Sequence, residues 1–206
     1  MPRRRMLIAN NYEILDSIIN DGEYYYILDD VMLTSDNYNT YFALTLRDNS
    51  NMALFGTRNS GGWEEEASGQ LGLFYFNGNL RHTWGNAYID EEYEPNVLIN
   101  KKLNVNSGNT EGPFVCNRPL VIFSNWSDGA IDNRIAKVEF YFILIYDSVG
   151  TLIHEFRPCQ FSNEPYPRII DVVTKKHINH PIFKYSIDIS YIYISPYSST
   201  DRTIVF

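Results

Sequence analysis

The stretch KVEFYFILIYDSVGTLIHEFRPC, residues 137–159, decides the fold. Apolar residues recur at every second position from Val138 onward, which is the period of a β-strand with one buried face. The sequence DSVG at 147–150 is typical of a turn, and a second strand is expected at 151–156. The stretch therefore predicts an antiparallel hairpin.

The two faces of the first strand are expected to differ. The face expected to point into the core carries Val138, Phe140, Phe142, Leu144 and Tyr146. The opposite face carries Lys137, Glu139, Tyr141, Ile143 and Ile145. Because this second face becomes apolar toward its end, we expect both faces to be covered there, as in a central strand of a sandwich.

Short strand patterns separated by turn residues fill most of the remaining chain. The clearest is a hairpin of residues 71–76 and 79–84, because the intervening Asn77-Gly78 tolerates the positive φ of a tight turn. Further strands are expected at 24–33, 41–46, 52–57, 97–105, 120–123 and 169–173. Helical signals are weak and occur at 13–19 and 63–67. The pattern predicts an all-β fold, a two-sheet antiparallel β-sandwich or jelly roll.

The composition agrees with a globular β protein that does not bind nucleic acid. The chain has 206 residues, of which 15% are aromatic, and aromatic residues favour strands. The net charge of −8 argues against phosphate contacts, which need a clustered positive face. No stretch approaches the ~20 apolar residues of a membrane span, so no membrane insertion is expected. Cys116 and Cys159 lack metal-ligand spacing and are expected to be buried free thiols, unless the fold brings them together as a disulfide.

Five stretches carry a resemblance to a known family. They are YEILDSIINDGEYYYI at 12–27, ALFGTR at 53–58, LGLFYFNGNLR at 71–81, AKVEFYFILIYDSVGTLIHEFRPC at 136–159 and PRIIDVVTKKHIN at 167–179. In order and spacing they resemble the laminin G-like, concanavalin A-like jelly-roll domains of phage and prophage structural proteins from gut bacteria. EPYPR at 164–168 replaces the family's usual glycine, and residues 181–206 match nothing in the family.

The resemblance implies a two-sheet sandwich in a phage particle, attached to the capsid, a fibre or the tail, and it implies no catalysis. We therefore expect a non-enzymatic virion structural protein, assembled in the host cytoplasm, with other virion proteins and further copies of itself as partners. Residues 12–180 would form the sandwich, between a basic arm at 1–11 and a C-terminal β extension at 181–206 that packs on the sandwich or on a partner chain. Assembly contacts are expected from Arg3, Arg4, Arg5, Tyr191 and Tyr193.

Other residues could carry chemistry, but each has a simpler interpretation. Cys159 follows Glu155 and Arg157, yet the resemblance treats it as a repeated structural element, so packing is favoured over nucleophilic catalysis. The acidic run with Asp90, Glu91 and Glu92 reads as a loop that could hold calcium, although such runs are usually solvated. We expect no obligatory cofactor. A glycosidase would need two carboxylates across a cleft, and no sequence feature selects such a pair.

Tryptophans in polar loops indicate an alternative function. Exposed Trp rings beside Asn and Asp can stack on a sugar while the polar groups bind its hydroxyls. The candidate residues for a carbohydrate site are Trp63, Trp84, Trp126, Asn125 and Asp128. An equally simple interpretation is that these rings cover the ends of the core. The alternative to a purely structural role is thus a lectin-like module for attachment to host or mucus glycans.

Overall fold

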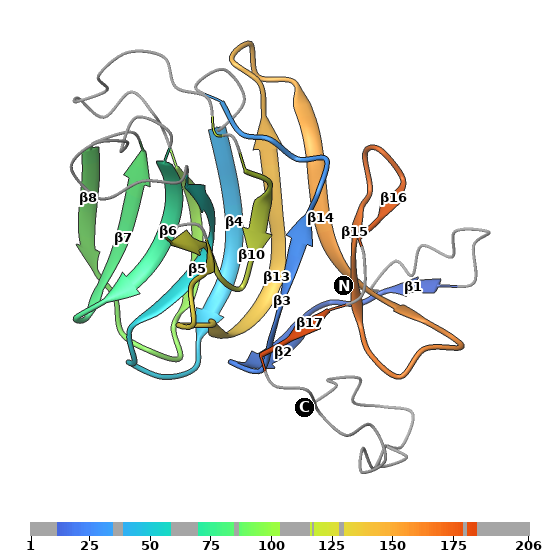
Figure 1. Cartoon of the computed structure of the whole chain (residues 1–206), viewed down its shortest axis with the longest axis horizontal. Helices are drawn as coiled ribbons and strands as arrows, with labels where there is room; N and C mark the ends of the chain where they lie inside the picture. Colours follow the sequence, from blue (N-terminus) through green and yellow to red (C-terminus); the bar gives the residue numbers. More distant parts are fainter. Residues whose placement is uncertain are drawn as a thin grey trace, which may run out of the picture.

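The computed structural model describes residues 12–34, 39–58, 70–84, 87–103, 116, 118–127, 130–178 and 181–184. These residues form two antiparallel sheets packed as a β-sandwich, with a short two-stranded hairpin beside them (Figure 1). The expected all-β sandwich is confirmed, whereas the jelly-roll connectivity stays a prediction. No membrane-spanning helix is found among the described residues.

One sheet has eight strands. Its main order is β16 (Lys176–His177), β15 (Arg168–Asp171), β14 (Leu152–Phe161), β13 (Lys137–Tyr146), β4 (Asn39–Leu46) and β9 (Leu98–Leu103). Two short strands join it near the N-terminus: β1 (Tyr12–Ile14) pairs with β14, and β2 (Ile18–Asp21) pairs with β13. The weak helical signal at 13–19 was therefore wrong, because pairing with distant strands overrides a weak local preference.

The second sheet has seven strands. Their order is β17 (Ile182–Phe183), β3 (Tyr24–Leu28), β10 (Leu120–Ile122), β5 (Met52–Arg58), β6 (Gln70–Phe76), β7 (Asn79–Trp84) and β8 (Ala87–Glu92). The separate hairpin consists of β11 (Trp126–Ser127) and β12 (Ala130–Ile131). The acidic run at 90–92 lies in strand β8, so its interpretation as a loop was wrong.

The β6–β7 hairpin confirms the prediction from Asn77-Gly78. Both turn residues have positive φ, 51° for Asn77 and 81° for Gly78, as a two-residue hairpin turn with the twist of its strands requires. The strands pair from Phe76 with Asn79 to Leu71 with Trp84.

The β13–β14 hairpin is also present, but it is joined along only half its length. Residues 143–146 pair with 152–156. Beyond this point the strands separate: the start of β13 pairs with β2, and the end of β14 pairs with β1. The N-terminal segment thus runs inward along β14, turns near Asp16, and runs outward along β13. Figure 1 shows β1 and β2 diverging in this way.

A β-bulge in β13 changes which residues face the core. The register with β4 shifts between Phe140 and Phe142, so Tyr141 is the extra residue. Because one inserted residue moves all later side chains to the opposite face, the buried set is Val138, Phe140, Ile143 and Ile145. The expectation that Phe142, Leu144 and Tyr146 face the core was wrong; these three are only half-buried.

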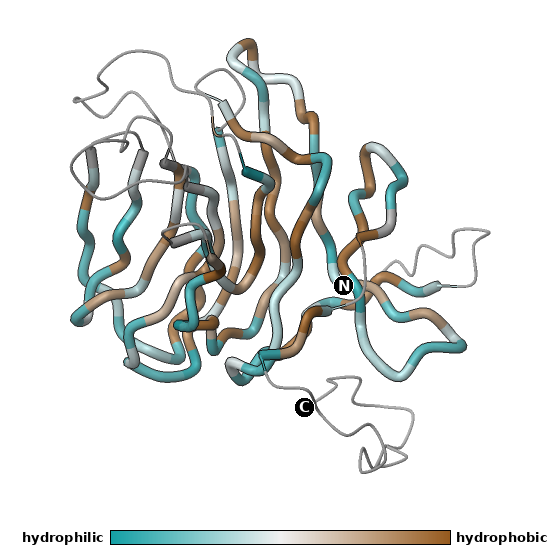
Figure 2. Tube along the Cα trace, viewed as in Figure 1, coloured by the Kyte–Doolittle hydropathy of each residue, from teal (hydrophilic) through white to brown (hydrophobic). Residues whose placement is uncertain are grey.

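Hydrophobic side chains form one main core between the sheets and a smaller cluster outside it. Figure 2 shows hydrophobic segments along the middle strands and hydrophilic ones at many of the turns. Phe140 packs edge-to-face on Phe123 in the main core, with ring centroids 5.4 Å apart. The smaller cluster, called the side cluster here, lies on the opposite face of β14 and β15 and contains Tyr12, Ile14, Cys159, Phe161, Ile170 and Val172.

The described part of the C-terminal extension packs on the sandwich. Ile182 and Phe183 pair with Tyr25 and Tyr24 at the edge of β3, and the Lys184 N–H donates to the carbonyl of Glu23. The chain reaches this edge directly from β16 of the other sheet. The described residues do not include 1–11, 63–67 and 185–206. The predictions that fall on these ranges therefore stay predictions.

Candidate functional site

Trp126 is the one tryptophan whose side chain is described, and its polar edge is already occupied. Its indole N–H donates to the carbonyl of Pro119 at 2.9 Å, and the guanidinium of Arg118 lies 4.7 Å from the ring centroid. One ring face and the N–H are therefore used within the chain. Trp63 and Asp128 lie outside the described residues. Trp84 lies in β7, but its side chain is outside the described part of the structure.

Asn125 is fully buried and has a structural position. Its Oδ1 accepts the N–H of Trp126 at 2.8 Å, and its amide lies against Gly56 and Gly72 of neighbouring strands. A Cβ on Gly56 would approach the carbonyl oxygen of Leu71 to 2.5 Å, which no real contact allows. Asn125 thus packs beside two glycines of paired strands, and because it is buried it presents no group to a ligand at the surface.

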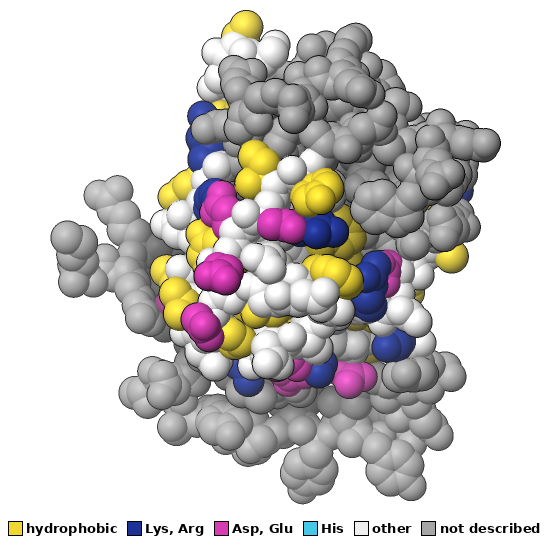
Figure 3. Space-filling model, turned by 90° about the vertical axis from the view of Figure 1, so that its left-hand side faces the viewer, with side chains coloured by type: hydrophobic (Ala, Val, Ile, Leu, Met, Phe, Trp, Pro, Cys, Tyr) yellow, Lys and Arg dark blue, Asp and Glu magenta, His cyan; other side chains and the backbone are white. Residues whose placement is uncertain are grey.

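Two of the three calcium candidates on β8, Asp90 and Glu91, are engaged with cations of other strands. Asp90 accepts two hydrogen bonds from Arg81, at 2.8 and 2.7 Å, and Glu91 forms an ion pair with Lys101. Asp90 and Glu91 point to opposite faces of the strand. No group of three acidic, His or Cys side chains suited to a metal occurs in the described part of the chain. The side of the molecule at β8 shows acidic, basic and apolar side chains interspersed (Figure 3).

Both cysteines are free and buried, as one alternative from the sequence predicted. Burial raises the pKa of each thiol, Cys116 and Cys159, to about 12. Little thiolate exists at neutral pH, so both thiols are poor nucleophiles. The side cluster accounts for Cys159 as a packing residue. The assembly candidates Arg3, Arg4, Arg5, Tyr191 and Tyr193 lie outside the described residues.

The outer face of the eight-stranded sheet carries a group of aromatic side chains. Phe42, Ile143 and Ile145 point into the core, so their neighbours along β4 and β13 point away from it. The resulting surface, called the aromatic outer face here, consists of Tyr41, Phe142, Leu144, Tyr146 and Arg157. Tyr41 and Phe142 are in contact, with ring centroids 5.4 Å apart.

Arginines lie over two rings on this side of the sheet. The Arg157 guanidinium is 4.6 Å from the Phe142 centroid, and Arg168 is 5.0 Å from that of Phe161 in the side cluster. Arg157 is oriented by Glu155, whose Oε1 accepts from its Nε at 2.8 Å. Aromatic outer face and side cluster therefore form neighbouring parts of one surface across β4, β13, β14, β1 and β15.

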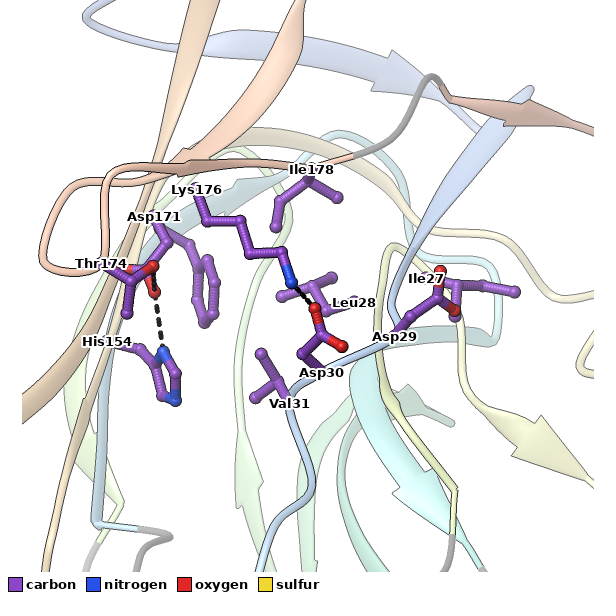
Figure 4. Close-up of a pocket in the computed structure, with 11 residues that line it drawn as sticks. Ile27, Leu28, Asp29, Asp30, Val31, His154, Asp171, Thr174, Lys176 and Ile178 are labelled. Atoms are coloured by element: carbon purple, nitrogen blue, oxygen red, sulfur yellow. Dashed lines mark hydrogen bonds and ion pairs between the residues drawn. The ribbon is translucent and has the colours of Figure 1, made fainter.

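A cavity of about 210 Å³ lies at the edge of the sandwich. It is situated where β3 of one sheet ends and faces β14, β15 and the following turn of the other sheet (Figure 4). Its lining residues are Ile27, Leu28, Asp29, Asp30, Val31, His154, Phe156, Asp171, Thr174, Lys176 and Ile178. We call it the edge pocket.

Asp171 fixes the orientation of His154 in the edge pocket. Its buried carboxylate accepts from His154 Nδ1 and Thr174 Oγ1, both at 2.7 Å, and from the N–H groups of Glu155 and Val173 at 3.1 Å. Burial alone would raise the pKa of Asp171, but the hydrogen bonds from His154, Thr174 and Glu155 outweigh it and lower the pKa. Since an ionised carboxylate only accepts, Nδ1 carries a proton, and Nε2 is left for another partner.

The opening of the pocket is bordered by an ion pair. Lys176 on β16 pairs with Asp30 on the turn after β3, and both side chains are more than half exposed. Such exposed pairs contribute little to stability, so this pair can exchange partners at small cost. It joins the two sheets across the pocket (Figure 4).

The remaining wall is apolar. Leu28, Val31, Phe156 and Ile178 are buried, and the His154 ring stacks nearly parallel to Phe156 at 5.5 Å. Covalent catalysis would need a nucleophile hydrogen-bonded to His154. The hydroxyl among the lining residues, on Thr174, donates to Asp171 instead. The arrangement suits ligand binding better than a nucleophilic reaction.

The sequence contained only a faint signal for this pocket. Asp171 ends a strand and is followed by turn residues that include Thr174, a pattern in which a carboxylate commonly accepts local hydrogen bonds. Nothing local connects Asp171 to His154, Asp30 or Leu28. These residues meet because β14 pairs with β15 and the chain then crosses to β3.

Comparison with known proteins gives no family for this chain. No model of a protein family matches it, and no curated protein has a significantly similar sequence.

Proposed function

We propose that this chain is a non-enzymatic structural protein of a bacteriophage virion, located on the capsid, a fibre or the tail. It acts by assembling with other virion proteins and with further copies of itself. The observation that carries this proposal is the aromatic outer face, because an antiparallel sheet that meets only water on one side usually has a polar face there.

The composition of this face is that of a protein interface. Interface centres are enriched in Tyr, Phe and Arg, and residues that dominate binding energy are most often Trp, Tyr and Arg. Tyr41, Phe142 and Arg157 supply these types side by side, from three adjacent strands. Arg157 can exchange its intrachain contact for a carboxylate of the partner.

The laminin G-like, concanavalin A-like jelly-roll assignment is part of the proposal. The two antiparallel sheets are compatible with it. In this scheme the sandwich is the body of the protein, and Arg3, Arg4, Arg5, Tyr191 and Tyr193 add contacts from the two ends of the chain.

Mass spectrometry of purified phage particles tests the proposal. Particles from a culture that carries the gene should contain the chain at a constant copy number relative to the major capsid protein. Its absence from particles that carry all other structural proteins would overturn the proposal.

A variant tests the role of the aromatic outer face. Phe142→Gln combined with Leu144→Gln should strongly reduce incorporation into particles, because it removes apolar contact area from the centre of the face. The control is Tyr88→Gln, which alters a more exposed ring on β8 of the other sheet. Thermal denaturation should show that both variants fold. Equal incorporation of variant and control would assign the contact to another surface.

Deletion of residues 1–9 tests the contribution of the basic arm. Incorporation should be lost while the circular dichroism spectrum and melting temperature stay unchanged. Normal incorporation of the truncated chain would remove the arm from the proposed assembly contacts.

The second candidate function is carbohydrate binding for attachment to host or mucus glycans. The edge pocket favours it, because an apolar wall combined with a few oriented polar groups is typical of small-ligand sites. A glycan array with the full chain is the test, and the absence of binding to every glycan would exclude it.

A further inference from the structure

We propose that the edge pocket binds one neutral sugar ring, the terminal residue of a glycan. This inference rests on the second candidate function and moves its site from the tryptophan loops to the edge of the sandwich, between β3 and β14–β16. It is independent of the proposed assembly through the aromatic outer face.

The charges of the pocket favour a neutral ligand. Three carboxylates line it, Asp29, Asp30 and Asp171, so an anion would be repelled. A cation would have to displace Lys176 from Asp30. Hydroxyl groups avoid both penalties, because each can donate to a carboxylate or accept from an ammonium group.

The polar groups are positioned for a ligand with several hydroxyls. Nε2 of His154 is held in place by the contact of Nδ1 with Asp171, and it has no hydrogen-bond partner among the described residues. Lys176 supplies donors and Asp30 supplies acceptors at the opening. A hydroxyl hydrogen-bonded to Nε2 of His154 and neighbouring hydroxyls reaching Lys176 and Asp30 would use the groups on both sides of the pocket, because a hydroxyl can both donate and accept.

The apolar wall and the size of the cavity indicate a single ring. A pyranose has C–H faces that can contact the parts of Val31 and Ile178 that line the pocket, while its hydroxyls point to the rim. The cavity of about 210 Å³ is smaller than the ~300–1,000 Å³ typical of sites for drug-sized ligands. One monosaccharide therefore occupies the pocket, and the rest of a glycan extends through the opening.

The test is saturation-transfer NMR on the full chain with glucose, galactose, mannose, N-acetylglucosamine and N-acetylgalactosamine, each at about 10 mM, a level that detects millimolar affinity. At least one sugar should receive saturation. Lys176→Met and His154→Phe should each weaken its binding at least about ten-fold, because each removes a hydrogen-bond partner of the ligand. Lys176 is exposed, so the first variant keeps the fold even if the second does not.

Lys137→Met is the matched control. Lys137 also pairs with an aspartate near the surface, Asp48 at 2.7 Å, but it lies eight residues along β13 from Ile145, the neighbour of His154, roughly 26 Å away. This variant should bind the sugar as the unaltered chain does.

The negative outcomes of this test distinguish a wrong pocket from a wrong function. Sugar binding that is unchanged in Lys176→Met and His154→Phe would overturn the pocket assignment and keep the lectin function at another site. No saturation of any sugar would overturn both. Loss of particle incorporation in Lys176→Met without any sugar binding would assign the pocket to a protein contact, and so would also overturn the proposal.

Discussion

The two ends of the β13–β14 hairpin contain similar residues but are built differently. At the closed end, residues 143–146 and 152–156 pair directly across a short turn. At the split end, β2 and β1 lie between the strands, and they come from more than 115 residues earlier in the chain. Alternation and turn residues suffice for the closed end, whereas the split end depends on pairing between distant segments.

The two arms of the split end differ in their hydrophobic contacts. The β13 arm of the split end contributes Val138 and Phe140 to the main core between the sheets. The β14 arm contributes Cys159 and Phe161 to the side cluster, which has only three fully buried residues. We therefore expect the β13 arm to be bound more strongly than the β14 arm.

The largest expected effect comes from Phe140→Ala. Removing this buried ring from the main core should lower the free energy of unfolding by about 3–5 kcal/mol, because it leaves a cavity that the sheets cannot close. Urea denaturation followed by tryptophan fluorescence measures the change. The matched variant Phe161→Ala in the half-buried side cluster should cost only about 1–2 kcal/mol. Equal losses would contradict the difference between the arms.

Asp171→Asn tests the point at which the hairpin splits, because Asp171 on β15 pairs with Phe156, the last residue of β14 that pairs with β13. It should lower the free energy of unfolding at pH 7 by about 1–3 kcal/mol, because it weakens hydrogen bonds to a buried carboxylate. The pKa of Asp171 is lowered in the folded state, so its stabilisation is present above about pH 4 and is lost as the pH falls through the folded pKa. Denaturation at pH 7 and at pH 3 should show a gap between variant and wild type that narrows at pH 3; a constant gap would contradict this.

Native-state thiol labelling compares the two clusters directly. Cys159 lies in the side cluster and Cys116 in the main core, and burial raises the pKa of both thiols to about 12. Both should react slowly with a maleimide at pH 8. Cys159 should react about ten-fold faster, because a small cluster opens locally at lower free energy than the main core. Equal rates would mean that the two clusters open only together. Mass spectrometry of labelled peptides distinguishes the two sites.

The smallest effect is expected from Lys137→Met at the split end. Its ion pair with Asp48 is partly exposed, so the loss should not exceed about 1 kcal/mol. Added salt should reduce the difference from wild type, as screening requires. A loss comparable to that of Phe140→Ala would show that the split end is held by charge rather than by packing.

The sequence predicted those parts of the fold that depend on local chemistry. The Asn77-Gly78 hairpin and the closed end of β13–β14 are of this kind. The bulge at Tyr141 could not be predicted, because an inserted residue in a long apolar strand leaves no mark on composition. The strand at 90–92 was missed since acidic residues are uncommon in strands, and here Arg81 and Lys101 on adjacent elements compensate them.

The edge pocket was beyond prediction for a different reason. Its residues come from three segments, 27–31, 154–156 and 171–178, and each segment reads as ordinary strand and turn. Asn125 was recognised as a residue of interest, but its burial over Gly56 and Gly72 depends on the pairing of β5 with β6. Spatial neighbours of this kind are set by topology, which a single sequence specifies only indirectly.

The position of β1 and β2 within the split has a consequence for biosynthesis. Residues 12–21 leave the ribosome well before their partners, because residues 137–140 and 159–161 are made more than 115 residues later. At typical translation rates of about 5–20 residues per second, the N-terminal strands wait roughly 7–28 s for them. During this interval the two short strands have no native partner, and they can pair only once β13 and β14 have been made.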